Sequence, residues 1–328
     1  MGYSQPMARF IAPLCLLTLL LHPPVSAADA GGPPAAVVRS GPVTVVHALG
    51  DAGYARAVAA LASTAHARIR EDIGLEHPVE AAILLLTGNS PAATREEWAR
   101  RLPSWMAGAA IPARQFIIVR VAPGQTPGSL EPLLAHELTH VILKADYPAH
   151  DSWPLWFQEG LAMRESRTEG LREYVTLSAA ALFDRMLPLE SLSASFPTAE
   201  AEARLAYAQS ASFLAFLDSQ SGKGRFLILM RELRVRGFEE AFRSAYGSGT
   251  GAAEGQWLRW VNRRFAWVPA LTSETSFWLL ITLLFLAAIV VRRRRSRLMR
   301  ERWEQEEAEE EGEEGEEEEN GDGPLKPN

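Results

Sequence analysis

The pentapeptide at residues 136–140, His-Glu-Leu-Thr-His, constrains this chain more than any other stretch. It lies inside an apolar run that is predicted to form a helix, with Ser129 as its N-cap. Residues four apart lie on one face of a helix, so His136 and His140 point the same way. Two imidazoles on one face can bind one zinc ion, and the carboxylate of Glu137 stands beside them to activate a bound water.

A catalytic zinc site needs a third protein ligand and an open fourth position. Eighteen residues separate His140 from Glu159, which lies in the segment Trp-Phe-Gln-Glu-Gly-Leu-Ala. The pattern HExxH-x18-E resembles that of the gluzincin metallopeptidases, whose third ligand is a glutamate at this spacing on a second helix. The resemblance therefore implies one zinc ion per chain, held by His136, His140 and Glu159.

The closer resemblance is to small membrane-associated proteins described as peptidase MA-like, and it covers roughly residues 43–266. It implies an α+β domain over residues 43–267, with a small N-terminal mixed sheet, a zinc-binding active-site helix and a C-terminal helical subdomain. Gluzincins often stabilise the oxyanion with a Tyr or His downstream of the third ligand. The resemblance places Tyr207 in that catalytic role, with Tyr174 as the alternative. An ordinary core tyrosine is the competing interpretation.

Two departures from the related patterns bear on activity. Thermolysin-like enzymes carry an Asp four residues after the ligand glutamate, where this chain has Met163, so the group that orients the first histidine must come from elsewhere. The large zinc aminopeptidases carry a Gly-x-Met-Glu-Asn motif that grips the free amine of the substrate, and residues 79–135 contain none. The resemblance therefore favours an endopeptidase over an aminopeptidase.

The sequence before the zinc helix alternates between strand and helix patterns. Strands are predicted at residues 43–47, 81–86 and 115–121, and helices are predicted after Asp51 and after Pro91. This order resembles the upper half of a gluzincin, where the edge strand of the sheet pairs with extended substrate.

The segment 108–112 is the candidate for that edge strand, and a plain turn is the alternative. After Glu159 the chain is predicted to be helical. Four helices are marked by residues at helical spacing: Leu205, Ala208, Ser212 and Phe216; Phe226, Met230 and Leu233; Phe238, Phe242 and Ala245; and Trp257, Trp260, Val261 and Phe265.

Both ends of the chain carry targeting patterns. Residues 1–28 have the basic, apolar and small-residue regions of a secretory signal peptide, with an uncleaved anchor as the alternative. Residues 29–42, rich in Gly, Pro and Ala, are predicted to be a linker. Residues 275–291 contain no charge and are predicted to form one transmembrane helix, with a buried soluble helix as the alternative. Residues 292–328 are predicted to be a disordered tail, first basic and then acidic.

The positive-inside rule places the arginines that follow residue 291 in the cytoplasm. The zinc domain is then extracytoplasmic, in the periplasm or at the cell surface. The net charge of −7 conceals a strong asymmetry, since residues 292–300 carry +6 and residues 301–328 carry −12. The remainder is nearly neutral, which argues against nucleic-acid binding. The only cysteine, Cys15, lies in the signal region, so a mature chain offers no thiolate to a metal.

The sequence thus predicts a single-pass, membrane-anchored zinc metallopeptidase that acts on a peptide or protein substrate. The alternative from another class is a catalytically silent domain that serves as a binding or scaffolding module of the cell envelope. The intact Glu137 argues against it, because a silent domain has no chemical need of that residue. A structural zinc site would need four protein ligands, and only three are apparent. Neither the natural substrate nor a partner for the tail is identified by these patterns.

Overall fold

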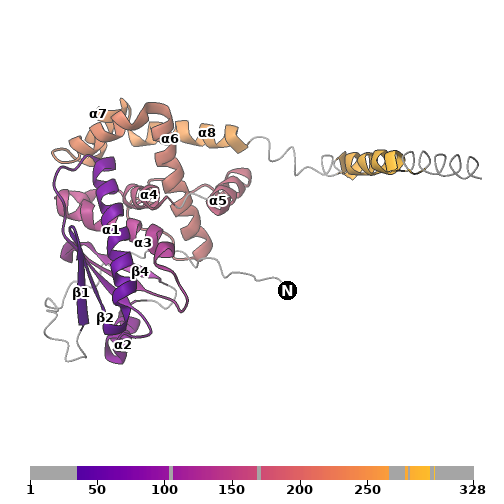
Figure 1. Cartoon of the computed structure of the whole chain (residues 1–328). Helices are drawn as coiled ribbons and strands as arrows, with labels where there is room; N and C mark the ends of the chain where they lie inside the picture. Colours follow the sequence, from indigo (N-terminus) through magenta and orange to yellow (C-terminus); the bar gives the residue numbers. More distant parts are fainter. Residues whose placement is uncertain are drawn as a thin grey trace, which may run out of the picture. The chain divides into compact units, whose positions relative to one another are not determined.

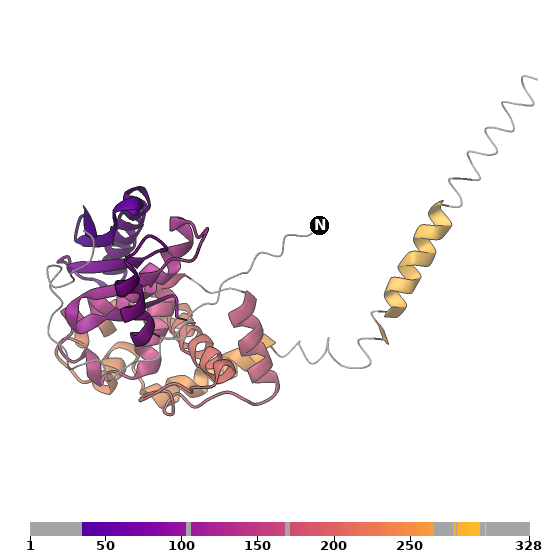
Figure 2. The same cartoon turned by 90° about the horizontal axis from the view of Figure 1, so that it is seen from below.

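The structure of the chain is a computed structural model that describes residues 35–102, 106–167, 171–265, 278–279, 281–295 and 299. The chain divides into two units, Met1–Phe265 and Ala266–Asn328. Within the first unit, Figures 1 and 2 show the strands at one side and helices α7 and α8 at the other. The expectation of a mixed α and β domain with a small N-terminal sheet is confirmed.

The sheet has five strands in the order β1-β2-β3-β5-β4. The central strands β2, β3 and β5 run parallel to one another, whereas the outer strands β1 and β4 pair antiparallel with β2 and β5 respectively. The strands are β1 Ala35–Ser40, β2 Val43–Ala48, β3 Ala81–Leu86, β4 Gly108–Ile111 and β5 Phe116–Arg120. The three strands predicted from the sequence are therefore confirmed, with ends shifted by one residue in two of them.

The prediction of a linker over residues 29–42 is wrong for its second half. Residues 35–40 form β1, which pairs antiparallel with β2 in a register that places Ser40 opposite Val43. Gly41, with a φ of 54°, makes the tight turn between the two strands. Gly41 and Pro42 form the hairpin turn, and Ala35 and Ala36 begin the short outer strand.

Helices cover both faces of the sheet. Val45, Ile83 and Ile117 align across three strands and are fully buried on the face that α1 (Ala52–Ile73) and α3 (Glu131–Asp146) cover. Ile118 points to the other face and packs against Trp98 of α2 (Ala92–Arg101). Helix α3, which carries His136 and His140, is thereby held directly against the sheet.

The prediction of Ser129 as the N-cap of the helix that carries His136 and His140 is wrong. A short 3₁₀ turn, Pro127–Leu130, precedes α3, and Leu130 occupies the N-cap position. The hydroxyl of Ser129 donates to the carbonyl of Thr126 inside that turn, 2.8 Å away, instead of capping the helix. The turn gives the first helical amides local partners and leaves no need for a serine cap.

The second half of the unit is helical, as predicted. Its helices are α4 Leu155–Ser166, α5 Leu171–Leu182, α6 Glu200–Glu232, α7 Phe238–Tyr246 and α8 Thr250–Phe265. The two helices expected around Phe216 and Phe226 are joined into α6 across a kink at Gly222, whose φ is 70°. Helix α5 was not among the four helices marked from the sequence, and few of its described side chains are buried.

In the second unit, residues 281–295 are helical. Among the described residues, no helix is both long and apolar enough to cross a membrane. Part of the predicted transmembrane segment (residues 275–277 and 280), residues 1–28 and the acidic tail from residue 300 lie outside the described part of the chain. The prediction that disorder begins at residue 292 is wrong for residues 292–295, because these arginines, which favour helix, continue the helical segment.

Gly160 sets the closest approach between α4 and α6. A Cβ at this position would lie 2.8 Å from the backbone oxygen of Ser210 and 3.1 Å from Leu214. Only glycine lets the two helices pack at this distance, and Glu159 is its direct neighbour.

Replacing Gly160 by alanine is therefore expected to lower the free energy of unfolding by roughly 1–3 kcal/mol, because a helix backbone would have to move. Gly255→Ala in α8 is a matched control, since its added Cβ would meet only the flexible end of Arg259 at 3.7 Å. The control should be neutral or stabilising by up to about 1 kcal/mol. Denaturant unfolding of both variants measures the effect, and equal stability losses would contradict it.

Candidate metal centre

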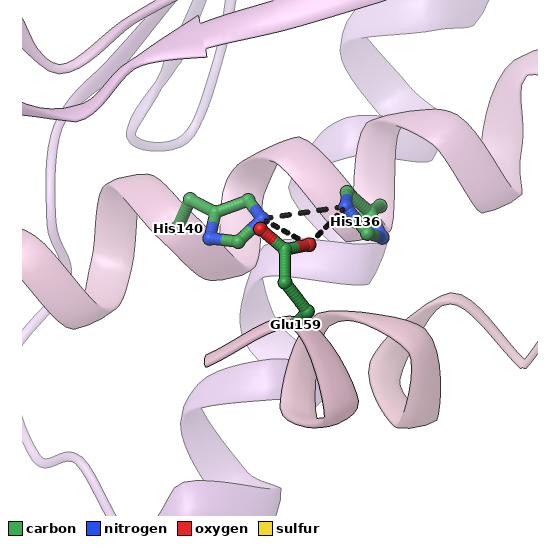
Figure 3. Close-up of side chains that lie close together, drawn as sticks. All are labelled: His136, His140 and Glu159. Atoms are coloured by element: carbon green, nitrogen blue, oxygen red, sulfur yellow. Dashed lines mark hydrogen bonds and ion pairs between the residues drawn. The ribbon is translucent and has the colours of Figure 1, made fainter. Parts of the chain in front are cut away.

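Three side chains from two helices converge on one point (Figure 3). His136 and His140 lie one turn apart on α3, and Glu159 reaches them from α4. The two Nε2 atoms are 3.3 Å apart, and Oε2 of Glu159 is 3.5 Å from that of His136 and 3.6 Å from that of His140. All three residues are buried, with exposed fractions of 0, 9 and 1 % respectively.

These separations suit a shared cation better than direct bonds between the side chains. Two zinc–ligand bonds of about 2.0–2.1 Å at the tetrahedral angle place their ligand atoms about 3.3–3.4 Å apart. Contacts of 3.5 and 3.6 Å are too long for strong hydrogen bonds to a carboxylate. The donor set, two imidazoles and one carboxylate, is also one that zinc accepts at catalytic sites. The residues therefore fit a zinc ion.

The electrostatics of the group favour a charged carboxylate. Burial alone would raise the pKa of Glu159, but the neighbouring His140 and His136 overcome it and lower that pKa to about 2. Burial lowers the pKa of His140, and Glu159 more than compensates, so that this pKa is raised. An ionised carboxylate in a site closed to water needs positive charge nearby, which a cation bound to the three ligand atoms would supply.

Glu137 lies on the same turn of α3 as His136 and is 2 % exposed. Burial raises its pKa, while His136, His140 and the backbone N–H of Ala110 act in the opposite direction. Its Oε1 has no hydrogen-bond partner among the described residues. A buried carboxylate with a free oxygen beside a candidate metal site is suited to accept a proton from water.

An ion-pair cluster holds the far end of α4. Arg68 of α1 contacts Glu165 twice, with Nη1 3.0 Å from Oε2 and Nη2 donating to the backbone carbonyl at 2.7 Å. Arg164 pairs with Asp218 of α6 at 3.0 Å. Burial raises the pKa of Glu165 to about 7, against the influence of both arginines. The helix that carries Glu159 is thus tied to elements on both of its sides.

Tyr207 does not belong to the converging group of ligand atoms. It is buried on α6 and packs against Met163, one helical turn after Glu159, with its ring 4.9 Å from that of Phe196. Tyr174, the alternative residue, is half-buried on α5.

The sequence left the group that orients the first histidine unidentified, and the described residues supply none. Nδ1 of His136 is buried and has no hydrogen-bond partner in the described part of the chain. Met163, at the position where thermolysin-like enzymes have an aspartate, packs with Tyr207 and Ala211 instead. The orientation of the His136 ring therefore depends on packing.

His150 was not singled out from the sequence, yet it is buried in the connection between α3 and α4. Its Nδ1 lies 3.5 Å from Oδ1 of Asp151. Burial and the nearby His140 lower its pKa to about 4, so the ring is neutral at physiological pH. A solitary histidine outside any motif carries no sequence pattern that would have indicated this position. The buried His66, by contrast, is satisfied by the carbonyl of Val79 at 2.8 Å.

Two histidines and a carboxylate on adjacent helices, with a second carboxylate alongside, form the kind of centre that metal-dependent hydrolases use. The model of the peptidase MA superfamily matches residues 62–263, more than half of the chain, and the chain belongs to that superfamily. No curated protein matches the chain.

Proposed function

We propose that this protein is a zinc-dependent peptidase of the gluzincin type, with one zinc ion held by His136, His140 and Glu159. The observation that carries the proposal is the convergence of three ligand atoms at 3.3–3.6 Å, next to the buried carboxylate of Glu137. Membership of the peptidase MA superfamily supports peptide-bond hydrolysis as the reaction.

Zinc bound at this site would supply a Lewis acid and a lower pKa for water. Glu137 takes a proton from the attacking water, whose oxygen bonds to the scissile carbonyl carbon. The same residue then gives the proton to the leaving nitrogen as the carbon–nitrogen bond breaks, so a peptide and water become an acid and an amine. The burial of Glu137 limits competing exchange of this proton with bulk water.

The edge strand β4 supports an endopeptidase. The N–H of Arg120 donates to the carbonyl of Ala107 at 2.8 Å, and this fixes the alternation of the β4–β5 ladder. Ala109 and Ile111 bond to β5, whereas the backbone groups of Gly108 and Ala110 point away from it. A peptide in extended conformation can add to such an edge at any point along its length, without a free terminus.

Hydrolysis of N-terminally acetylated peptides by the purified protein tests both proposals together. The native protein is expected to contain one equivalent of zinc and to cleave internal bonds. Glu137→Gln should retain zinc and lose turnover by about 10²–10⁴-fold. Glu131→Gln, at an exposed position of the same helix, is the matched control and should behave as the native protein. Zinc without cleavage would favour a scaffolding role, and absence of zinc would refute the site.

Tyr207 of α6 is proposed as the group that stabilises the oxyanion. It packs against Met163, which lies one helical turn after Glu159 on α4. Tyr207→Phe should lower kcat by about 10²–10³-fold with little change in KM, because the hydroxyl acts only as the negative charge develops. Steady-state kinetics alongside Tyr174→Phe measure this. A loss of kcat in the second variant alone would transfer the role to Tyr174.

We also propose that residues 275–291 anchor the protein in a membrane, with the zinc domain outside the cytoplasm. The support is a run of seventeen uncharged residues, about 25 Å long as a helix, that is followed by four arginines. The full chain is expected to remain with membranes after a carbonate wash, and a chain that ends at residue 265 and keeps the signal should be released. Release of both would contradict the anchor.

A further inference from the structure

The strand β4 and the helix α3 run side by side, and one contact sets their alignment. A Cβ on Gly108 would lie 3.1 Å from Cδ2 and 3.2 Å from Cδ1 of Leu133, so this face of the strand rests on Leu133. Glu137 follows Leu133 by one helical turn, about 6 Å along the axis. Ala110 follows Gly108 by two strand residues, about 6.6 Å. The two steps match, which brings Ala110 opposite Glu137.

The main-chain N–H of Ala110 is a hydrogen-bond donor that the sheet does not use. Its N–H is not used in the ladder with β5, because the hydrogen-bonded pairs of that ladder are formed by Ala109 and Ile111. The N–H of Ala110 acts on the carboxyl of Glu137 and lowers its pKa, which places this donor on the side of the strand where Glu137 lies. The packing of Gly108 on Leu133 brings Ala110 opposite Glu137, and the register of β4 turns the N–H of Ala110 away from β5.

We propose that the main-chain N–H of Ala110 is the positioning group of Glu137: it orients the carboxylate at the edge of the sheet and couples the general base to the strand that receives the substrate. The inference rests on the proposed function for the role of Glu137. On the same edge, the N–H and C=O of Gly108 and the C=O of Ala110 remain available to a peptide. One short strand therefore sets the position of both the base and the scissile bond.

Amide hydrogen exchange of the zinc-free full chain, resolved to single residues, tests the contact without any need for activity. An outward-facing edge amide should exchange rapidly, so slow exchange at Ala110 is expected only if Glu137 accepts its hydrogen bond. Glu137→Ala should accelerate exchange at Ala110 by roughly 10- to 100-fold. Glu137→Gln should keep the amide protected, because its side-chain oxygen can still accept.

Two controls separate a lost bond from a loosened strand. The neighbouring amide of Ala109, bonded within the ladder, should be unaffected by either substitution at Glu137. Thr139→Val removes a buried hydroxyl elsewhere on α3, which bonds the carbonyl of Ala135 at 2.8 Å, and should leave the protection of Ala110 intact. Unchanged exchange at Ala110 in Glu137→Ala, or equal acceleration at Ala109 and Ala110, would overturn the proposal.

The role in catalysis is tested with Ala110→Pro, which removes this N–H while sparing the ladder, at an edge position that tolerates proline. The variant should bind zinc as the native protein does and lose kcat by about tenfold or more, whereas Glu131→Gln, at an exposed position of α3 outside the site, should not. Unchanged kcat in Ala110→Pro would overturn the positioning role. Lack of cleavage by the native protein would instead refute the proposed peptidase, and the exchange result would still stand.

Discussion

The buried carboxylate of Glu159 is the constraint on which the arrangement of the first unit depends. A charge that is 1 % exposed is expensive unless opposite charge compensates it, and Glu137 is a second acid in the same place. A buried carboxylate beside a second acid calls for compensating positive charge, which a divalent cation bound to the three converging atoms would supply. The charges and distances of the site therefore fit a bound metal ion better than direct hydrogen bonds among the three side chains.

A ligand contributed by a second helix is useful only if that helix is held to within a few tenths of an ångström. Gly160 allows α4 to lie directly on the backbone of Ser210 in α6. At the end of the same helix, Arg68 bonds both the side chain and the carbonyl of Glu165, which ties α4 to α1. Contacts of α4 with both halves of the unit thus fix Glu159. This explains why a motif of a few residues requires a domain of more than two hundred to support it.

The sequence was informative wherever function depends on local spacing. His136 and His140 are related by one helical turn, so their shared face followed from the helix period alone. Glu159 needed the resemblance as well, because spacing along the chain does not dictate how α3 and α4 cross. Features set by distant contacts were missed: β1 is stabilised by pairing with β2 and not by its composition, and His150 is buried through the fold of a connecting segment. The prediction of Ser129 as the N-cap was wrong because a 3₁₀ turn before the helix was equally compatible with the sequence.

An exposed sheet edge is usually a hazard, because its free N–H and C=O groups can pair with another chain. Strand β4 limits that hazard by its length of four residues and by Pro112, which follows it and has no N–H to offer. If Ala110 also gives its outward N–H to Glu137, only Gly108 retains both outward groups for a passing strand. Such an edge is too short to recruit a stable extra strand but sufficient to hold a peptide briefly. Weak, transient pairing is what a hydrolase requires, since its products must leave.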